Sequence, residues 1–184
     1  YDRDYLRSRV TAGEAFDFYY ASDEDRVAGL RQPITDGAHG KPWVFRPKDV
    51  KNWWLNAHHD RPGGIENVSA TAWQPQSKPV WFTELGCPAI DKGTNGPNVF
   101  VDAKSSENAV PPFSGGQPDD VIQNRYLTVM SDYWSTTGAH NPVSAVTGLP
   151  MVPADRLFFW AWDARPYPAF PVRTDIWGDG SNHA

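Results

Sequence analysis

One carboxylate, Glu84, stands at the end of the most strand-like apolar segment of the sequence. The stretch KPVWFTELGCPA, residues 78–89, runs through four apolar residues to this carboxylate and is then broken by Gly86 and Pro88. The pattern predicts a buried strand from Pro79 to Glu84. In parallel α/β sheets the working residues lie at the carboxyl ends of the strands. Glu84 is therefore the first candidate for chemistry.

A second carboxylate, Asp163, follows another strand-like segment. The run RLFFWAW, residues 156–162, is strongly apolar, and Asp163 is the first residue after it before the proline-rich text ARPYP. Because side chains alternate along a strand, Trp160 and Trp162 share one face. Asp163 is thus predicted to lie at the same edge of a sheet as Glu84.

The elements that must position these residues alternate between helix and strand. Strands are predicted for residues 15–21, 79–84 and 156–162. One helix is expected to end near Val10, a second to run from Ser22 to about Gln32, and a third to cover Asp119–Trp134. Long proline-rich loops separate them. This order favours an α/β fold with a parallel sheet and outer helices, formed by a single domain over residues 1–184. The three strands are expected to be parallel, with the Asp119 helix crossing between the last two.

The bulk composition excludes some classes of function. The 184 residues carry a net charge of −5 and no Lys/Arg run, so nucleic acid is not expected as a ligand. No stretch approaches the roughly 18 apolar residues of a membrane span. Nine Trp, seven Tyr and nine Phe suit a core, and equally a wet surface that stacks against ligands.

The histidines and the single cysteine of the sequence give little support for a metal site or a nucleophilic thiol. His58, His59 and Asp60 resemble metal ligands, but adjacent histidines point apart on regular backbone and no third histidine stands at ligand spacing. A loop that hydrogen-bonds itself or contacts a ligand cleft is the favoured interpretation. Cys87 is the sole cysteine and lacks a partner motif for nucleophilic chemistry. No metal and no cofactor are predicted.

Several long strings of the sequence resemble a known family. WFTELG and FFWAWDARPYPAFP resemble the ends of strands seven and eight of a glycoside-hydrolase TIM barrel. More narrowly, GKPWVFRPKDVKNWW, HHDRPGG, QSKPVWFTELGCPAIDKGTN and PNVFVDAKSSE are similar to the TIM-barrel-like domain of the large tail proteins of gene transfer agents. Gene transfer agents are phage-like particles, and the large tail protein of this family sits at the hub or tip of their tail. The implied fold is the C-terminal part of a (β/α)8 barrel with long loop insertions, excised from a larger protein.

The resemblance implies a catalytic role for Glu84 and raises the question of which carboxylate would be its partner. Glu84 corresponds to the nucleophile of retaining glycosidases, which lies about 5 Å from a second carboxyl group. Asp17, in the strand of residues 15–21, is a candidate for that second group if its face is the barrel lumen. The alternatives stay open: Glu84 could pair with Arg46 or Arg165 and only hold loops, and Asp17 could form a buried ion pair.

Substrate-binding candidates follow from the same strings. Trp162 would floor a sugar site or belong to the core, whereas for Trp160 the core is the favoured interpretation. Asp163 would hydrogen-bond a sugar hydroxyl or cap the following turn. Arg46 and His58, each within a family-like string, are further candidates.

The resemblance also limits what this chain can do alone. A complete barrel needs about 250 residues, and only three strands are predicted here. The acid/base glutamate of such enzymes ends strand four, which would lie upstream of Tyr1, so the isolated piece is expected to be inactive.

The expected function is action on, or binding of, cell-envelope glycan by a tail protein. Its partners would be polysaccharide or peptidoglycan and other tail or baseplate proteins, and its place a particle tail made in the bacterial cytoplasm. The alternatives are a non-catalytic structural or glycan-binding domain of the tail hub and a free-standing glycosidase fragment.

Overall fold

A computed structural model describes residues 2–99, 101, 106, 108–160, 169–178 and 180–182. In these ranges the α-helices are α1 Arg3–Arg9, α2 Asp23–Ala28, α3 Val50–Leu55, α4 Asp120–Ser135 and α5 Ala169–Val172. The strands are β1 Phe18–Tyr19, β2 Gln32–Pro33, β3 Phe82–Leu85 and β4 Leu157–Phe159. Short 3₁₀ helices, η1 to η5, cover Pro42–Phe45, Pro62–Gly64, Gly93–Asn95, Ala154–Arg156 and Gly180–Asn182.

The helix expected after Asp119 is confirmed as α4. The Asp119 carboxylate accepts a hydrogen bond from the backbone N–H of Ile122 at 3.1 Å and so caps the helix. Apolar residues recur on one side of the helix, and Ile122, Val129 and Trp134 are buried there. The helix is held by this buried stripe, as expected for an amphipathic helix that packs on a sheet.

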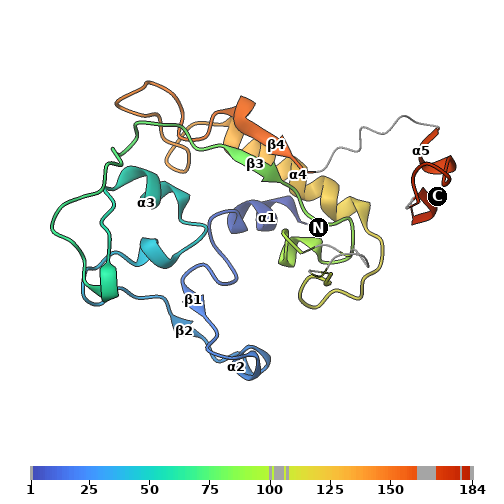
Figure 1. The fold of residues 1–184 in the computed structure, drawn as a ribbon, viewed down its shortest axis with the longest axis horizontal. Coiled ribbons are helices and arrows are strands. Elements are labelled where there is room, and N and C mark those ends of the chain that lie inside the picture. The colour runs from blue at the N-terminus through green and yellow to red at the C-terminus, as the bar shows by residue number, and fades with distance from the viewer. Residues whose placement is uncertain are drawn as a thin grey trace.

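Strands β3 and β4 pair in parallel, as predicted, and α4 lies between them in the chain. Figure 1 shows α4 running along this two-stranded sheet. The main core forms between them and α3, where Trp54 is fully buried and donates its indole N–H to the carbonyl of Lys78 at 2.7 Å. The other buried members of this cluster are Leu85, Met130, Tyr133, Trp134, Met151 and Val152.

A buried amide joins α4 to the segment that leads into β4. The Asn141 side chain donates to the carbonyls of Trp134 at 2.8 Å and Val152 at 2.9 Å, and accepts from the N–H of Val152 at 2.9 Å. Buried backbone groups need such partners. Asn141 therefore fixes the position of the chain before β4 relative to the end of the helix.

The prediction that the segment 15–21 is parallel to the other two strands is wrong. Its strand β1 has two residues and pairs antiparallel with β2, Phe18 opposite Pro33 and Tyr19 opposite Gln32. Ser22 caps α2 as expected, but the helix ends early at Gly29, whose left-handed backbone turns the chain back along β1. Figure 1 shows this β1–α2–β2 excursion projecting away from β3 and β4.

The fold is thus α/β in a coarse sense. The described strands form two separate two-stranded sheets, one antiparallel and one parallel, and they do not close a barrel. The family-like strings do not produce a third parallel strand in the described part of the chain.

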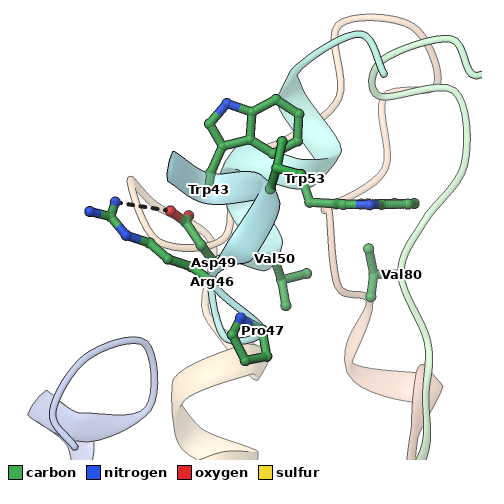
Figure 2. A pocket seen from close by; sticks show the side chains of 8 residues that line it. Trp43, Arg46, Pro47, Asp49, Val50, Trp53 and Val80 are labelled. Carbon is green, nitrogen blue, oxygen red and sulfur yellow. Dashed lines mark ion pairs between the residues drawn. The ribbon is translucent and has the colours of Figure 1, made fainter. Parts of the chain in front are cut away.

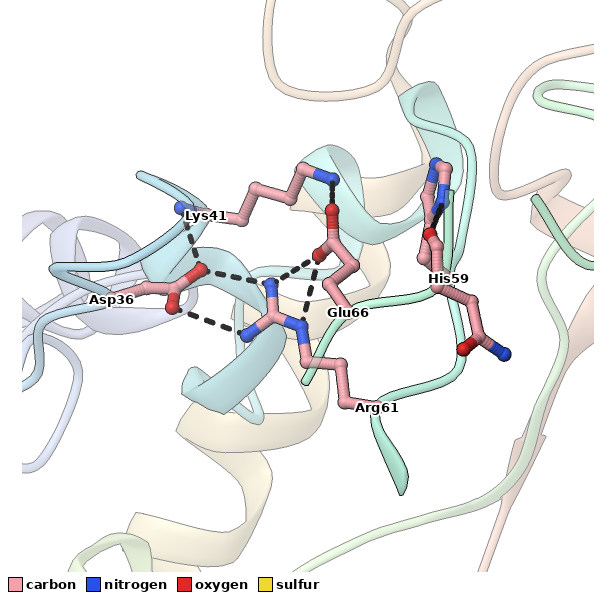
Figure 3. A network of polar contacts seen from close by, with 6 residues as sticks. Asp36, Lys41, His59, Arg61 and Glu66 are labelled. Carbon is pink, nitrogen blue, oxygen red and sulfur yellow. Dashed lines mark hydrogen bonds and ion pairs between the residues drawn. The ribbon is translucent and has the colours of Figure 1, made fainter. Parts of the chain in front are cut away.

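Four charged side chains fasten the long loop after α3 to the segment before η1 (Figure 3). The Arg61 guanidinium contacts both oxygens of Asp36, at 3.1 and 2.9 Å, and Glu66 at 2.9 and 2.7 Å. Lys41 donates to the other oxygen of Glu66. Arg61 lowers the pKa of the Asp36 carboxyl, and Lys41, more than Arg61, lowers the pKa of Glu66. We call these four residues the charge clamp.

The charge clamp makes stability depend on pH in a defined direction. Because both carboxyl pKa values are lowered by folding, the clamp stabilises the fold above about pH 4 and this contribution is lost as the pH falls through the folded values. We expect Arg61→Met to lower the thermal unfolding midpoint at pH 7, and to lower it much less near pH 3. Circular dichroism melts at both pH values measure this.

The matched control is Arg31→Met, which removes an exposed ion pair with Glu14. Such surface pairs contribute little, so its midpoint should stay near that of the unchanged protein at both pH values. An equal loss for Arg61→Met at pH 7 and pH 3 would contradict the role of the clamp charges.

Candidate functional site

Strand β3 contains an irregularity that determines where Glu84 points. Phe82 packs against Trp134 of α4, with ring centroids 5.4 Å apart, and Leu85 lies in the same core. Residues three apart cannot share a face of a regular strand, and the pairing with β4 is indeed irregular between them. The two residues between, Thr83 and Glu84, are exposed. The bulge thus directs Glu84 away from the core.

Exposed aromatic side chains lie on the same two strands and their flanks. The Trp81 and Phe158 rings are 6.2 Å apart, and the Arg156 guanidinium lies 4.6 Å from the Trp81 ring centre. Trp81 is 51% exposed and Trp160 is 52% exposed. The prediction that Trp160 belongs to the core is therefore wrong. We call Trp81, Glu84, Phe158 and Trp160 the open sheet surface.

Gly86 is required by the close approach of the two strands just after Glu84. The backbone N–H of Trp160 donates to the carbonyl of Leu85 at 2.9 Å. A Cβ atom on Gly86 would lie 2.1 Å from the carbonyl oxygen of Trp160. This contact explains why the apolar run of β3 breaks at a glycine directly after the carboxylate.

The structure leaves Glu84 without a charge partner among the residues it describes. Arg46, one of two arginines considered for it, contacts Asp49 instead at 3.7 Å. Arg165, Trp162 and Asp163 lie outside the described residues. In the described chain the Glu84 side chain is exposed.

Asp17 and Glu84 are not brought together. Asp17 is exposed, and its backbone carbonyl accepts a hydrogen bond from the N–H of Ile34 at 2.8 Å, beside the antiparallel β1–β2 pair. The β1–β2 pair lies apart from β3 and β4 (Figure 1). In this structure the two carboxylates therefore do not form a pair that could act on one glycosidic bond.

Arg46 and His58 belong to a different place, around α3. The His58 ring lies 4.4 Å from the Trp53 ring and 5.4 Å from the Trp73 ring, and it stacks nearly parallel to the latter, with 11° between the ring planes. Trp43 is 5.8 Å from the same histidine. Arg46 and two of these tryptophans line a pocket (Figure 2). Sequence reasoning named Arg46 and His58 as binding candidates, but did not name the three tryptophans that pack around His58 as such.

The two adjacent histidines, His58 and His59, form hydrogen bonds with nearby backbone carbonyls. His58 Nε2 lies 2.7 Å from the carbonyl oxygen of Trp53, and His59 Nδ1 lies 2.9 Å from that of Asn67.

Within the described ranges there is no group of three His, Cys, Asp or Glu residues that could hold a metal ion. In the same ranges, no helix combines the length and apolar character needed to cross a bilayer.

Cys87 is a packing residue of the core. It is fully buried, and burial raises the pKa of its thiol to about 12. Its backbone carbonyl accepts a hydrogen bond from the Gln123 side chain of α4 at 2.8 Å. A thiol that stays protonated and buried is a poor nucleophile.

The chain matches a model of a known protein family. A sequence model described as the GTA TIM-barrel-like domain matches residues 1–171. No curated protein matches the chain significantly.

Gly86→Ala should perturb the open sheet surface. The added Cβ would meet the Trp160 carbonyl, so the strands must separate or shift, which costs about 1–3 kcal/mol as overpacking does. Urea unfolding measures the loss. Gly37→Ala is the control, because nothing lies within 4 Å of the position of its Cβ. Equal stability of the two variants would contradict the close approach.

Cys87 should resist alkylation in the folded protein. With its thiol pKa near 12 and no exposed surface, it is expected to react with iodoacetamide at pH 8 only as fast as the protein opens. The same chain in denaturant is the control and should label rapidly at this one site. Rapid stoichiometric labelling of the folded protein would show that Cys87 is accessible.

Proposed function

Because the chain belongs to the GTA TIM-barrel-like domain family, we propose that it is a glycoside-hydrolase-like domain of a gene transfer agent tail protein. It acts on or binds glycan of the cell envelope, either polysaccharide or peptidoglycan. The observation that carries the proposal is the open sheet surface, where Glu84 is exposed near the carboxyl end of a parallel strand with Trp81, Phe158 and Trp160.

The side chains of this surface suit sugar chemistry. Apolar faces of pyranose rings pack on aromatic side chains, and Trp81 and Trp160 each present about half of their surface. Glu84 supplies one carboxylate of the pair that glycoside hydrolysis requires. The second carboxylate is supplied in this proposal by strands of the same protein outside this chain, because Asp17 lies in the separate β1–β2 hairpin.

The uncovered sheet supports the idea of a larger barrel. Only one face of β3–β4 packs against α4, and the other carries half-exposed aromatic residues. A two-stranded sheet is marginal in water unless further strands or helices cover it. Additional parallel strands would cover this face and place Glu84 at the mouth of the completed barrel.

A non-catalytic structural or glycan-binding role in the tail hub is the second candidate. It is favoured by the surroundings of Glu84, because the Glu84 side chain makes no hydrogen bond or ion pair within the described residues. A nucleophile is normally held by its neighbours. In either case we propose a place in the particle tail, assembly in the bacterial cytoplasm, and other tail or baseplate proteins as partners.

The test is Glu84→Gln in the full-length protein. Loss of a positioned carboxylate should lower hydrolysis of peptidoglycan or polysaccharide by at least roughly 10²–10⁴-fold, while pull-down on the same insoluble glycan stays unchanged. Reducing-end release and co-sedimentation measure the two effects. Glu24→Gln is the matched control, an exposed carboxylate of α2 that should leave both unchanged.

Three outcomes would count against the proposal in different ways. Cleavage at a normal rate by the isolated 184-residue chain would refute the divided site. A full-length protein that binds glycan but never cleaves it, with Glu84→Gln indistinguishable from the unchanged protein, would establish the non-catalytic role. A full-length protein with neither binding nor cleavage would remove the glycan proposal altogether.

A further inference from the structure

A pocket of about 270 Å³ lies beside α3, at the opposite end of β3 from Glu84. Trp43 of η1, Trp53 of α3 and Val80, which precedes β3, form its apolar walls. Val80 is four residues before Glu84, a span of roughly 13 Å along an extended chain. The pocket is therefore separate from Glu84.

Trp53 is held rigidly while part of its ring stays open. Its indole is packed against His58 at 4.4 Å and Trp73 at 4.9 Å between ring centres. The Trp73 indole N–H donates to the carbonyl of Asn56 at 3.1 Å, which fixes this backing residue. Trp53 nevertheless remains 45% exposed. A ring fixed before binding loses little conformational entropy when a ligand stacks on it.

The pocket also has a polar side. Figure 2 shows Arg46 and Asp49 to one side of Val50, with Trp53 and Val80 to the other. Arg46 Nη1 lies 3.7 Å from Asp49 Oδ2, and the Asn52 amide donates to both Asp49 oxygens at 2.8 and 3.0 Å. The buried Arg46 Nε has no hydrogen-bond partner in the described structure. This side offers the Arg46 guanidinium as a hydrogen-bond donor, and its charge is balanced by Asp49.

We propose that this pocket binds one neutral hexopyranose residue of a glycan, as an anchoring site that takes no part in bond cleavage. The apolar face of the ring would stack on the indoles, and its hydroxyls would accept hydrogen bonds from the Arg46 guanidinium. The volume falls just below the roughly 300–1,000 Å³ of pockets for drug-sized ligands, so it accommodates one ring.

The charge balance selects against other ligands. A cation would need an unpaired carboxylate, but Asp49 is already paired with Arg46 and bonded to Asn52. An anion would need a free cation, and Arg46 is opposed by Asp49. A purely apolar group would leave the Arg46–Asp49 pair dehydrated without compensation. A neutral polyol satisfies all three conditions.

The experiment follows the indole N–H signals of the protein by ¹H–¹⁵N NMR, with the nine tryptophans assigned by single Trp→Phe variants. Methyl β-glucopyranoside and N-acetylglucosamine are the neutral probes, and choline and glucuronate are the charged ones. We expect saturable shifts at Trp43 and Trp53 with the neutral probes, and weaker binding of both charged probes.

The variant Trp53→Ala should weaken this binding by roughly tenfold or more, since it removes the stacking surface. Phe113→Ala is the matched control, because Phe113 is 80% exposed and lies outside the pocket and the open sheet surface. Trp43→Ala provides a second variant should Trp53→Ala unfold, as judged by far-ultraviolet circular dichroism. Glu84→Gln should leave the titration unchanged, which separates this inference from the proposed function.

Several results would overturn the inference. They are saturable shifts only at Trp81 and Trp160, tighter binding of choline or glucuronate than of the neutral sugars, or the absence of saturable shifts at Trp43 and Trp53. Unchanged affinity in a folded Trp53→Ala variant would do the same.

Discussion

The packing of α4 against one side of the β3–β4 pair is the interaction on which the other features depend. Two parallel strands do not persist in water unless one face is covered, and here Trp134 of α4 and the fully buried Trp54 of α3 cover it. The same packing fixes β3 at both ends. Leu85 lies in the core just after Glu84, and the Val80 N–H donates to the carbonyl of Met151 at 2.7 Å beside the α3 pocket. One short strand therefore places both candidate sites.

The parts of the fold that follow from local patterns could be predicted. Helix α4 has a cap at Asp119 and an apolar stripe, and β3 and β4 are apolar runs bounded by glycine and proline. The direction of β1 could not be predicted in this way. It depends on Gly29, whose left-handed conformation ends α2 after six residues and reverses the chain. A run of aromatic residues indicates a strand but does not state its partner.

The candidate sites were predicted only in part, for a similar reason. Glu84 could be chosen because it ends an apolar run. The bulge that exposes Thr83 and Glu84 has no recognisable signal in the sequence. Beside the α3 pocket, a cluster of Trp43, Trp53 and Trp73 brings together a 3₁₀ helix, a six-residue helix and a loop. Their closeness depends on hydrogen bonds between segments distant in the sequence, such as those from the Trp73 indole N–H to the carbonyl of Asn56 and from the Gln76 N–H to the carbonyl of Trp54. The only available signal was the density of tryptophans around HHDRPGG.

The bulge also constrains how the open sheet surface can be covered. Burying an ionised carboxylate without a partner costs several kcal/mol, so strands laid over Glu84 must either bring a cation to it or leave it facing water. The aromatic residues have the opposite requirement, because Trp81 and Trp160 gain stability from any apolar cover. Both requirements are met if added strands pack over the aromatic rings and end level with Glu84. That arrangement leaves the carboxylate at a rim walled by tryptophans, where a pyranose ring can reach both.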